Sequence, residues 1–401
     1  MELPTIKNYD LRNKKVLLRL DINSPLDPRS GEILDTFRIR SHIPTLEALS
    51  DSKVVVLAHQ SRPGLEDFTT LEKHADKLAE FLDKEVKYID DIFGSAAREE
   101  IANLENGEVL VLENVRFCSE EVSENVIRKP PEEQAKTIFV RKLSPCVDFY
   151  VNDAFAVSHR SQPSVVAFPK VLPSAAGLLL DKEVKTLREV LKCKDSPRVF
   201  LFGGAKAKDT LKVIENLLKN ELAEYILTSG IVGNLFLKVR GYSLGKENEK
   251  ALKEEEIEVA KKLDNEKIIT PLDIAYSKEG KRKEIKVENL KNSNIKIKIL
   301  DIGRETIAYY SSIIRQAKLV VANGPCGVFE MEEFALGTKE MIKQIANSRA
   351  ISILGGGHLS AIARSMRMAD KITYISTGGK ACLRFLAGEK LVGVEVLSCL
   401  A

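Results

Sequence analysis

The stretch with the clearest capacity for chemistry covers residues 199–210, VFLFGGAKAKDT. Its first four residues are apolar and are typical of a buried parallel strand. Gly203 and Gly204 follow directly, Lys206 comes next, and an amphipathic helical pattern starts after Asp209. A strand, a glycine turn and a helix N-terminus direct backbone N–H groups at an anion, and a lysine adds a full positive charge. We therefore predict a phosphate site here.

Polar residues, among them three arginines, follow each of four apolar strands predicted in the first half of the chain. They are Asp21, Asn23, His59, Arg62, Asn114, Arg116, His159 and Arg160, and Arg38 lies just before the first predicted helix. Ligands bind outside the carboxyl ends of the strands in open α/β sheets, so we expect these side chains to share one edge. Because guanidinium groups bind phosphate and carboxylate in a bidentate manner, the cluster predicts a small phosphorylated acid as ligand.

Glycine-rich loops follow strands in the second half of the chain. They contain Gly203 and Gly204, Gly324, Gly355 to Gly357, and Gly378 with Gly379. Glycine allows the backbone to approach a ligand closely, so several such loops on one edge favour a nucleotide polyphosphate site. Glu330 is a candidate partner for the ribose hydroxyls.

A site for a phosphorylated acid and a site for a nucleotide together predict phosphoryl transfer, with domain closure that excludes water. No general base stands out, and a carboxylate acceptor needs none because it carries no proton. Transfer would then depend on positioning and charge stabilisation. The sequence has no G-x-x-x-x-G-K-[ST] motif, so it is not a P-loop protein.

Strands and helices alternate along both halves, which predicts an α/β fold of two doubly wound, Rossmann-like parallel-sheet domains joined by a connecting helix. We predict strands at 15–20, 53–58, 108–113, 148–153, 199–202, 224–228, 267–270, 318–322, 350–354 and 371–375. Helices are predicted near 41–49, 69–82, 95–103, 131–143, 209–219, 233–239, 250–263, 305–315, 337–346, 359–366 and 380–386. We predict that the charged stretch 278–298 is a solvated excursion from the second domain.

A break in composition places the domain boundary near residue 173. Residues 1–172 contain four of the 23 glycines, whereas residues 1–173 contain 11 of the 14 prolines, and the remainder reverses both trends. We therefore predict a first domain at 1–172, a connecting helix at 173–192 that opens with Pro173 and Ser174, and a second domain at 193–388.

Composition excludes several classes of function. A net charge of +3 gives no strong attraction to nucleic acid or to a membrane surface. The chain has no apolar run near the roughly 18 residues of a membrane span and does not start like a signal peptide, so we expect a cytoplasmic protein. The six cysteines are widely spaced and read as reduced thiols. His42 and His74 lie in helical patterns and are expected to be structural or exposed.

Several motifs resemble a known family. RLDINSP (19–25), the Arg38 segment, AHQSRP (58–63), LENVRF (112–117) and YVNDAFAVSHR (150–160) resemble the 3-phosphoglycerate half of phosphoglycerate kinases. GGAKAKD (203–209), ANGPCGVFE (322–330), LGGGH (354–358) and STGGK (376–380) resemble the nucleotide half. The similarity runs from about residue 5 to the C-terminus. LVGVEVLSCL (391–400) resembles the family's last segment, which packs back onto the first domain, so we expect residues 389–401 to do the same.

The resemblance implies transfer from 1,3-bisphosphoglycerate to ADP, giving 3-phosphoglycerate and ATP, with Mg2+ bound chiefly through the nucleotide phosphates. The residues implied to bind the acid are Asp21, Asn23, Arg38, His59, Arg62, Arg116 and Arg160. Those implied to bind the nucleotide are Gly203, Gly204, Lys206, Gly230, Asn323, Glu330, Gly355, Gly356, Gly357 and His358. Arg38 and Lys206 would face the transferred phosphoryl group, and the amides of Gly356, Gly357, Gly378 and Gly379 would stabilise its charge. The family contains both monomers and homodimers.

Three positions depart from the family pattern. Thr210 stands where a second lysine is frequent, His358 stands where a magnesium-associated aspartate is usual, and Lys380 replaces a third glycine. We hypothesise that Lys380, at a helix N-terminus, compensates for the charge missing at Thr210. His358 is a poor ligand for Mg2+, which prefers oxygen.

Two alternative functions remain open at this point. A kinase for another small phosphorylated acid would use the same scaffold. A phosphate- or RNA-binding protein would use the arginine edge without catalysis, but its cations would be expected on a basic surface with stacking aromatics. Here the cations follow strands, aromatic residues make up 6%, and Trp is absent.

Overall fold

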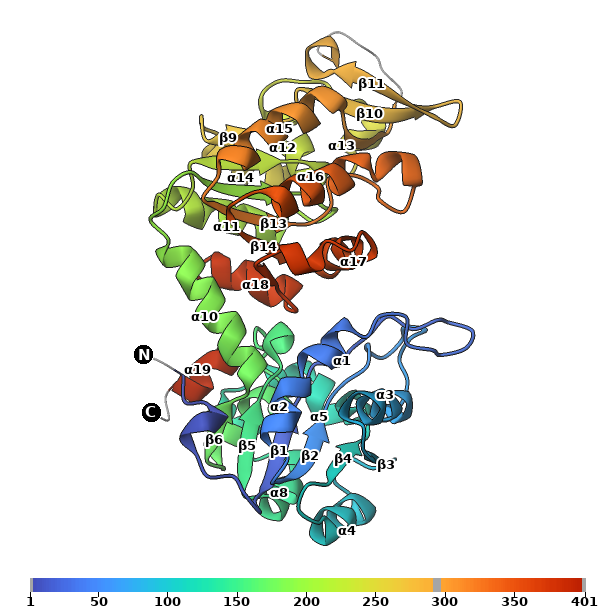
Figure 1. Ribbon diagram of the computed structural model, residues 1–401, viewed down its shortest axis with the longest axis vertical. Helices are drawn as coiled ribbons and strands as arrows, with labels where there is room; N and C mark the ends of the chain where they lie inside the picture. The colour runs from blue at the N-terminus through green and yellow to red at the C-terminus, as the bar shows by residue number, and fades with distance from the viewer. Residues whose placement is uncertain (1–2, 291–296, 399–401) are drawn as a thin grey trace. The chain divides into compact units, whose positions relative to one another are not determined.

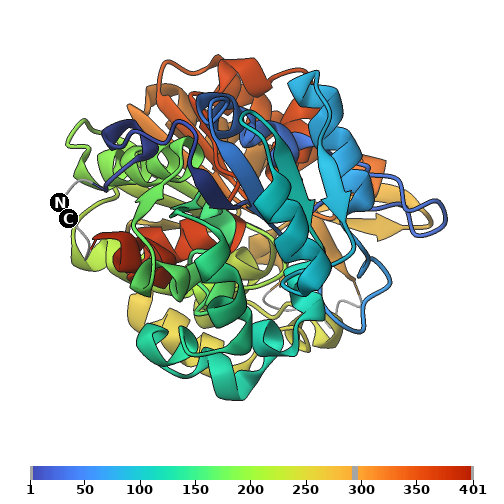
Figure 2. The same ribbon diagram turned by 90° about the horizontal axis from the view of Figure 1, so that it is seen from below.

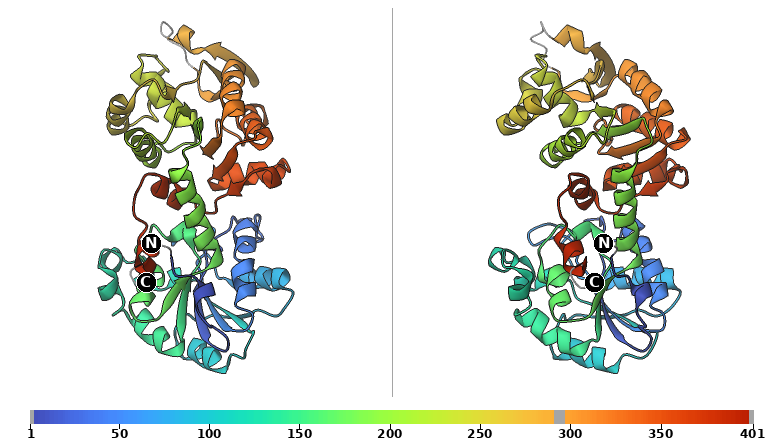
Figure 3. Two further views of the ribbon diagram at one scale, coloured as in Figure 1. Left: turned by 60° about the vertical axis from the view of Figure 1, so that its left-hand side comes forward. Right: turned by 90° about the vertical axis from the view of Figure 1, so that its left-hand side faces the viewer.

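The structure is a computed structural model that describes residues 3–290 and 297–398. The chain divides into two compact units, one formed by the residues up to Lys185 together with those from Lys390 onward, and the other by Thr186–Glu389. Helix α10 (Leu178–Lys192) begins in the first unit and ends in the second, and both views of Figure 3 show it as one continuous helix.

The first unit is built on a six-stranded parallel sheet in the order β3-β4-β2-β1-β5-β6. The strands are β1 (Lys15–Arg19), β2 (Lys53–Leu57), β3 (Lys87–Ile89), β4 (Val109–Leu112), β5 (Phe149–Asn152) and β6 (Ser174–Ala176). Alternate residues of β1 enter different cores, since Val16 and Leu18 belong to one buried cluster and Leu17 to another. Both faces of the sheet are therefore covered, as a parallel sheet requires.

Short helices connect these strands (Figure 1). They are α1 (Phe37–Ser41), α2 (Ile43–Ala48), α3 (Glu72–Leu82), α4 (Ser95–Asn103), α5 (Ser119–Val122), α6 (Glu124–Ile127), α7 (Pro131–Gln134), α8 (Ile138–Leu143) and α9 (Pro163–Val166). Helix α19 (Val392–Ser398) contacts α9 and β6, and Figure 2 shows this red helix among green segments of the first unit. Gly393 N donates to Ser158 O at 2.8 Å, so the C-terminal helix is hydrogen-bonded to the first unit.

The second unit also contains a six-stranded parallel sheet, in the order β15-β14-β13-β7-β8-β9. The strands are β7 (Arg198–Phe202), β8 (Tyr225–Thr228), β9 (Ile268–Ile269), β13 (Leu319–Asn323), β14 (Ile351–Gly355) and β15 (Tyr374–Ile375). The helices are α11 (Lys208–Lys219), α12 (Gly230–Val239), α13 (Lys246–Glu249), α14 (Glu254–Leu263), α15 (Arg304–Gln316), α16 (Leu336–Asn347), α17 (Gly357–Ser365) and α18 (Gly379–Leu386).

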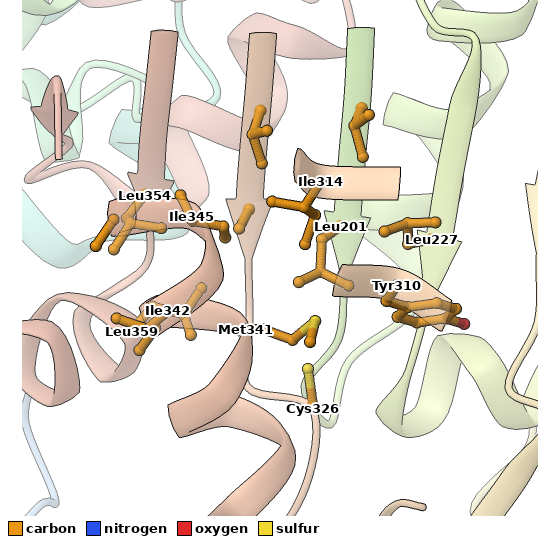
Figure 4. Packing of buried hydrophobic residues seen from close by; sticks show 14 of the residues in the cluster. Leu201, Leu227, Tyr310, Ile314, Cys326, Met341, Ile342, Ile345, Leu354 and Leu359 are labelled. Carbon is orange, nitrogen blue, oxygen red and sulfur yellow. The ribbon is translucent and has the colours of Figure 1, made fainter. Parts of the chain in front are cut away.

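A buried cluster fixes the strand ends of the second sheet (Figure 4). Leu201 and Leu227 from β7 and β8 meet Ile314 and Met341 from α15 and α16. Tyr310 of α15 is fully buried in the same cluster, and its hydroxyl donates to Thr228 O at 2.7 Å. Since β8 ends at Thr228, this contact ties the helix to the edge from which the glycine loops leave.

The predicted fold class, two doubly wound parallel-sheet domains, is confirmed. The charged stretch 278–298 contains a strand that was not predicted, since β11 (Lys281–Lys286), whose residues are exposed or half-buried, pairs with β10 (Asp273–Lys278) in an antiparallel sheet completed by β12 (Ile299–Ile302); residues 291–296 lie outside the described part. The predicted start of the connecting helix is wrong. Residues 174–176 form edge strand β6, so the connecting helix starts at Leu178.

Other predicted elements shift in detail. The helix expected at 131–143 is divided into α7 and α8. The helix expected near 41–49 is α2, and α1, which precedes it, was not predicted; Arg38 therefore lies within a helix and not before the first one. Among the described helices, none is both long enough and apolar enough to cross a membrane.

Candidate functional site

The end of β1 brings three predicted residues together in the first unit. Arg38 Nη1 lies 3.4 Å from Asp21 Oδ2 and donates to Asn23 O at 3.2 Å. Asn23 Oδ1 accepts from Ser61 N at 2.7 Å, which joins this loop to the one after β2. Burial alone would raise the pKa of Asp21, but the charges of Arg38 and of neighbouring residues outweigh it and hold that pKa below its ordinary value. Asp21 is therefore an ionised carboxylate that orients Arg38.

Arg116 supplies a buried guanidinium to the same edge. Its Nη1 donates to Ser61 O, whereas its Nη2 is buried and makes no hydrogen bond within the described residues. Burial, reinforced by the charges of Arg160 and Arg19, lowers the pKa of Arg116 to about 10. A buried donor without a partner, close to like charges, is what a bound anion would satisfy.

Arg19 is a site residue that sequence reasoning missed. It is fully buried, its Nε donates to Ser164 Oγ at 2.9 Å, and its Nη2 lies 3.2 Å from His59 Nδ1. Buried Glu121 accepts from Ser164 Oγ at 2.6 Å, so a carboxylate lies behind the cation. The available signal was an arginine within an apolar strand, two residues before Asp21.

The remaining predicted residues of this edge differ in exposure. Burial holds the pKa of His59 well below its ordinary value, so the ring is neutral near pH 7 and acts through hydrogen bonds. Arg62 and Arg160 are exposed at the surface of the same unit. His42 and His74 are both buried, which excludes the expectation that either is exposed.

In the second unit, strand-end loops together with residues 247–251 and 298–302 line a pocket of about 670 Å3, a size typical of small-molecule sites. The predicted residues that line it are Gly203, Gly204, Lys206, Gly230, Asn323, Glu330, Gly356, Gly357 and His358. Gly355, Gly378 and Gly379 lie outside the lining. The structure thus brings most of the predicted nucleotide residues together around one space.

The glycines of this pocket do two different things. A Cβ on Gly203 would lie 2.2 Å from Pro325 O, and a Cβ on Gly324, whose φ is +83°, would lie 2.4 Å from Gly203 O. These two loops therefore need glycine in order to contact each other. Gly357 is different, because a Cβ there would meet nothing within 4 Å. Gly357 faces open space and leaves room for a ligand.

Two helices begin next to each other at the pocket's edge. Gly357 opens α17 and Gly379 opens α18, and a Cβ on Gly379 would lie 3.4 Å from Gly356 Cα. Helix N-termini carry N–H groups without intrahelical partners and favour anions. Asn323 Nδ2 is also buried here and makes no hydrogen bond within the described residues. These donors suit the phosphates of a nucleotide.

The apolar part of the pocket was not predicted as such. Pro325, Val328 and Phe329 lie within the motif at 322–330, but Ile231, Leu300 and Leu383 come from separate segments outside the predicted motifs. The ring of His358 lies 4.9 Å from that of Phe329, centroid to centroid. An apolar wall next to phosphate donors is the composition expected where a base binds beside its phosphates.

The three departures from the family pattern lie near the pocket. Thr210 and His358 line it, and Thr210 is buried. Lys380 Nζ, at the start of α18, lies 3.4 Å from Asp209 Oδ2 in the first turn of α11. Among the residues that the structure describes, no group of three or more His, Cys, Asp or Glu side chains is placed to hold a metal ion.

A cluster of arginines on one α/β unit and a glycine-lined pocket on the other are the arrangement expected of a phosphotransferase with two Rossmann-like domains, and comparison with known proteins shows that class. The family model described as phosphoglycerate kinase matches residues 6–389. The chain therefore belongs to the phosphoglycerate kinase family, which confirms the resemblance found in its motifs.

Related proteins agree over the full length. The chain is 49% identical to the phosphoglycerate kinase of Methanothermus fervidus, covering 98% of this chain and 96% of that protein. It is 47% identical to the enzyme of Archaeoglobus fulgidus over 98% and 96%. The crystal structure of phosphoglycerate kinase from Pyrococcus horikoshii has a TM-score of 0.91 at 43% identity, covering 99% of both chains. That of Coxiella burnetii has a TM-score of 0.79 at 30% identity, again covering 99% of both.

Proposed function

We propose that this chain catalyses the reversible transfer of a phosphoryl group from 1,3-bisphosphoglycerate to Mg-ADP, giving 3-phosphoglycerate and ATP. The family match supports the reaction class. The observation that carries the proposal is the pocket of the second unit, which is lined by nine of the ten residues that the family motifs assign to the nucleotide.

The first unit is proposed to bind the glycerate ligand. Arg116 has a buried nitrogen without a hydrogen-bond partner among the described residues, and Arg38 is oriented by an ionised carboxylate. Charge-assisted hydrogen bonds to phosphate are worth about 1.5–3 kcal/mol each. The proposal assigns Asp21, Asn23 and His59 to the hydroxyl and carboxylate, and Arg62, Arg116 and Arg160 to the phosphate.

The second unit is proposed to bind the nucleotide. The apolar wall beside Phe329 takes the base, Glu330 takes the ribose hydroxyls, and Lys206 takes the phosphates. The N-termini of α17 and α18, with the amides of Gly356, Gly357, Gly378 and Gly379, would stabilise charge on the phosphoryl oxygens. Gly355 acts indirectly, since a Cβ there would lie 2.6 Å from Asn323 Nδ2.

Mg2+ is proposed to be held by the nucleotide phosphates and water. Magnesium prefers oxygen ligands, whereas His358 offers nitrogen and has its ring against Phe329. When bound, the ion would neutralise part of the phosphate charge. The chain's own contribution is the cationic Lys206, the helix N-termini and the buried amide of Asn323.

The reaction needs no general base in this proposal. The bond between phosphorus and the acyl oxygen breaks, the bond between phosphorus and the ADP β-phosphate oxygen forms, and the carboxylate leaves with its electron pair. No proton moves in this step. Since both ligands must meet, closure of the two domains over them belongs to the proposal, and it would also exclude water.

A coupled assay tests the proposal. Protein, MgATP and 3-phosphoglycerate are mixed, and NADH oxidation by glyceraldehyde-3-phosphate dehydrogenase reports the acyl phosphate. Turnover that disappears in Arg38→Ala supports the proposal. Binding of both ligands without turnover would direct attention to Thr210, His358 and Lys380. Absence of 3-phosphoglycerate binding would overturn the substrate assignment and favour another phosphorylated acid.

A further inference from the structure

The buried imidazole of His42 contacts the backbone of Asp21. Strand β1 ends at Arg19, so the N–H of Asp21 lies beyond the strand although Asp21 is still buried. It donates to His42 Nε2 at 3.1 Å, and the same nitrogen lies 3.2 Å from Asp21 O. A neutral ring can accept from the N–H and a protonated ring can donate to the carbonyl, so either form of the imidazole has a partner in Asp21.

The other ring nitrogen of His42 contacts a second buried carboxylate. His42 Nδ1 lies 2.7 Å from Asp153 Oδ2, and the two side chains are at most 2% exposed. Asp153 follows β5, and its own N–H donates to Arg19 O at 3.0 Å. The imidazole is therefore fixed from behind, and its Nδ1–H is directed to the carboxylate.

Asp153 also holds the start of α10. Its Oδ1 accepts from Leu179 N at 2.9 Å and from Leu180 N at 3.2 Å, which satisfies two free N–H groups of the first turn. A Cβ on Gly177 would lie 2.2 Å from Asp153 Oδ1, so glycine is needed for this approach. Thr45 Oγ1 accepts from Leu178 N at 3.0 Å and completes the cap.

We propose that His42 is a positioning residue for the glycerate site. Its ring connects the backbone of Asp21 to the carboxylate of Asp153, and Asp153 in turn binds the first turn of α10. Asp21 in turn orients Arg38. The kinetic consequence of this role rests on the proposed function, because the ligand concerned is the phosphorylated acid. The structural consequence, protection of the Asp21 amide from hydrogen exchange, is a property of the free protein.

Two substitutions separate the two ring nitrogens. His42→Asn places an amide near the Nδ1 position, so it keeps the contact with Asp153 and loses the one with Asp21. His42→Gln places an amide near the Nε2 position, so it keeps an acceptor for Asp21 N. We expect His42→Asn to raise KM for 3-phosphoglycerate by about tenfold, as a small displacement of site groups does. His42→Gln keeps the acceptor for Asp21 N but loses the contact with Asp153, so it should recover part of this loss, and KM for MgATP should stay unchanged in both variants.

Thr45→Val is the matched control. It removes the hydroxyl cap of Leu178 N but leaves the contacts of His42 with Asp21 and Asp153 in place. It should lower the unfolding temperature without changing KM for 3-phosphoglycerate. Equal KM changes for both substrates in His42→Asn, or equal KM values for 3-phosphoglycerate in the Asn and Gln variants, would overturn the proposal.

Hydrogen exchange tests the contact without catalysis. In the free wild-type protein, the Asp21 amide should exchange as slowly as the amides of β1, and His42→Asn should accelerate it while leaving Leu179 and Leu180 protected. A fast Asp21 amide in the wild type overturns the proposal even if His42→Asn does not fold. If the wild type shows slow exchange but does not bind 3-phosphoglycerate, the proposed substrate is wrong and the positioning contact stands.

Discussion

Lys380 Nζ lies 3.4 Å from Asp209 Oδ2, and this ion pair joins the first turn of α18 to the first turn of α11. Lys380 is 51% exposed. An exposed pair of this kind contributes little to stability, at most about 1 kcal/mol. We therefore explain the position of Lys380, between two helix N-termini, by the positive charge that it places there and not by a contribution to the stability of the fold.

The first prediction concerns Lys380. Since it places a cation where helix N–H groups already favour an anion, Lys380→Ala should lower kcat by about tenfold while the unfolding temperature barely changes. Lys212→Ala is the control, because it removes another partly exposed ion pair of α11, the helix that carries Asp209: the pair of Lys212 with Glu389 at 2.7 Å. Unchanged turnover in Lys380→Ala, together with loss of turnover in Lys206→Ala, would show that Lys380 does not replace the charge missing at Thr210.

The second prediction concerns Arg116, whose buried charge lies close to Arg160 and Arg19. Arg116→Met removes a charge that burial disfavours, so the free energy of unfolding should stay within about 1 kcal/mol of the wild-type value. Stabilisation by sulfate, a simple analogue of the phosphate group, should be lost because the unpaired Nη2 is gone. Thermal unfolding with and without sulfate measures both effects.

Arg128 provides the control for that experiment. Its side chain is 77% exposed and pairs with Glu124 at 3.2 Å within the same unit. Arg128→Met should therefore keep the full sulfate effect. Equal loss of stabilisation in both variants would mean that sulfate acts through the general charge of the protein.

The third prediction concerns His358, whose ring contacts that of Phe329. Because the ring is engaged with an aromatic neighbour and offers nitrogen, His358→Phe should leave the apparent affinity for Mg2+ unchanged in the presence of ADP. Titration of Mg2+ at fixed ADP, followed by turnover, gives that affinity. A weaker Mg2+ affinity in His358→Phe would show that the imidazole is a ligand after all.

Most of the parallel framework could be predicted because buried strands are short apolar runs bounded by polar residues. Strands β1, β2, β4, β5 and β7 lie within one residue of their predicted limits. The motif residues were found for a similar reason, since ligand-binding groups follow the carboxyl ends of such strands.

What the sequence could not show depends on tertiary contacts. Strand β11, KRKEIK, is highly charged and has no apolar pattern, and it forms because β10 pairs with it. The sequence around Arg19 predicts only a strand, because Ser164, which accepts a hydrogen bond from Arg19, lies 145 positions away in the chain. His42 has no local motif, because its partners Asp21 and Asp153 meet it only in the folded sheet.

The fourth prediction concerns pH. Burial lowers the pKa of His74 to about 4, whereas an unfolded histidine titrates near 6.5. The unfolded chain therefore takes up this proton first, and stability from this group is present above pH 6.5 and is lost as the pH falls toward 4. Between pH 6.5 and 5 the loss should be about 2 kcal/mol.

His74→Gln tests this contribution. His74 Nε2 lies 3.1 Å from Gln60 Oε1, and a glutamine amide can donate to the same oxygen without titrating. Denaturant unfolding at pH 7 and pH 5 should show a smaller difference in the variant than in the wild type. The same difference in both proteins would mean that other groups cause the acid dependence.

The last prediction compares two glycines of the nucleotide pocket. A Cβ on Gly357 would meet nothing within 4 Å, whereas Gly324 has a φ of +83° and its Cβ would lie 2.4 Å from Gly203 O. Gly324→Ala should therefore destabilise the protein by about 2 kcal/mol or more, because both the conformation and the contact forbid a side chain. Gly357→Ala should fold normally.

The nucleotide affinity distinguishes the two positions further. If the open space beside Gly357 is where the phosphates bind, one added methyl group should raise KM for MgATP about tenfold. KM for 3-phosphoglycerate should not change, because that ligand is assigned to the first unit. A Gly357→Ala variant with wild-type stability and wild-type KM for MgATP would place the phosphates away from the N-terminus of α17. It would leave Lys206 and the loop of Gly203 and Gly204 as the phosphate site.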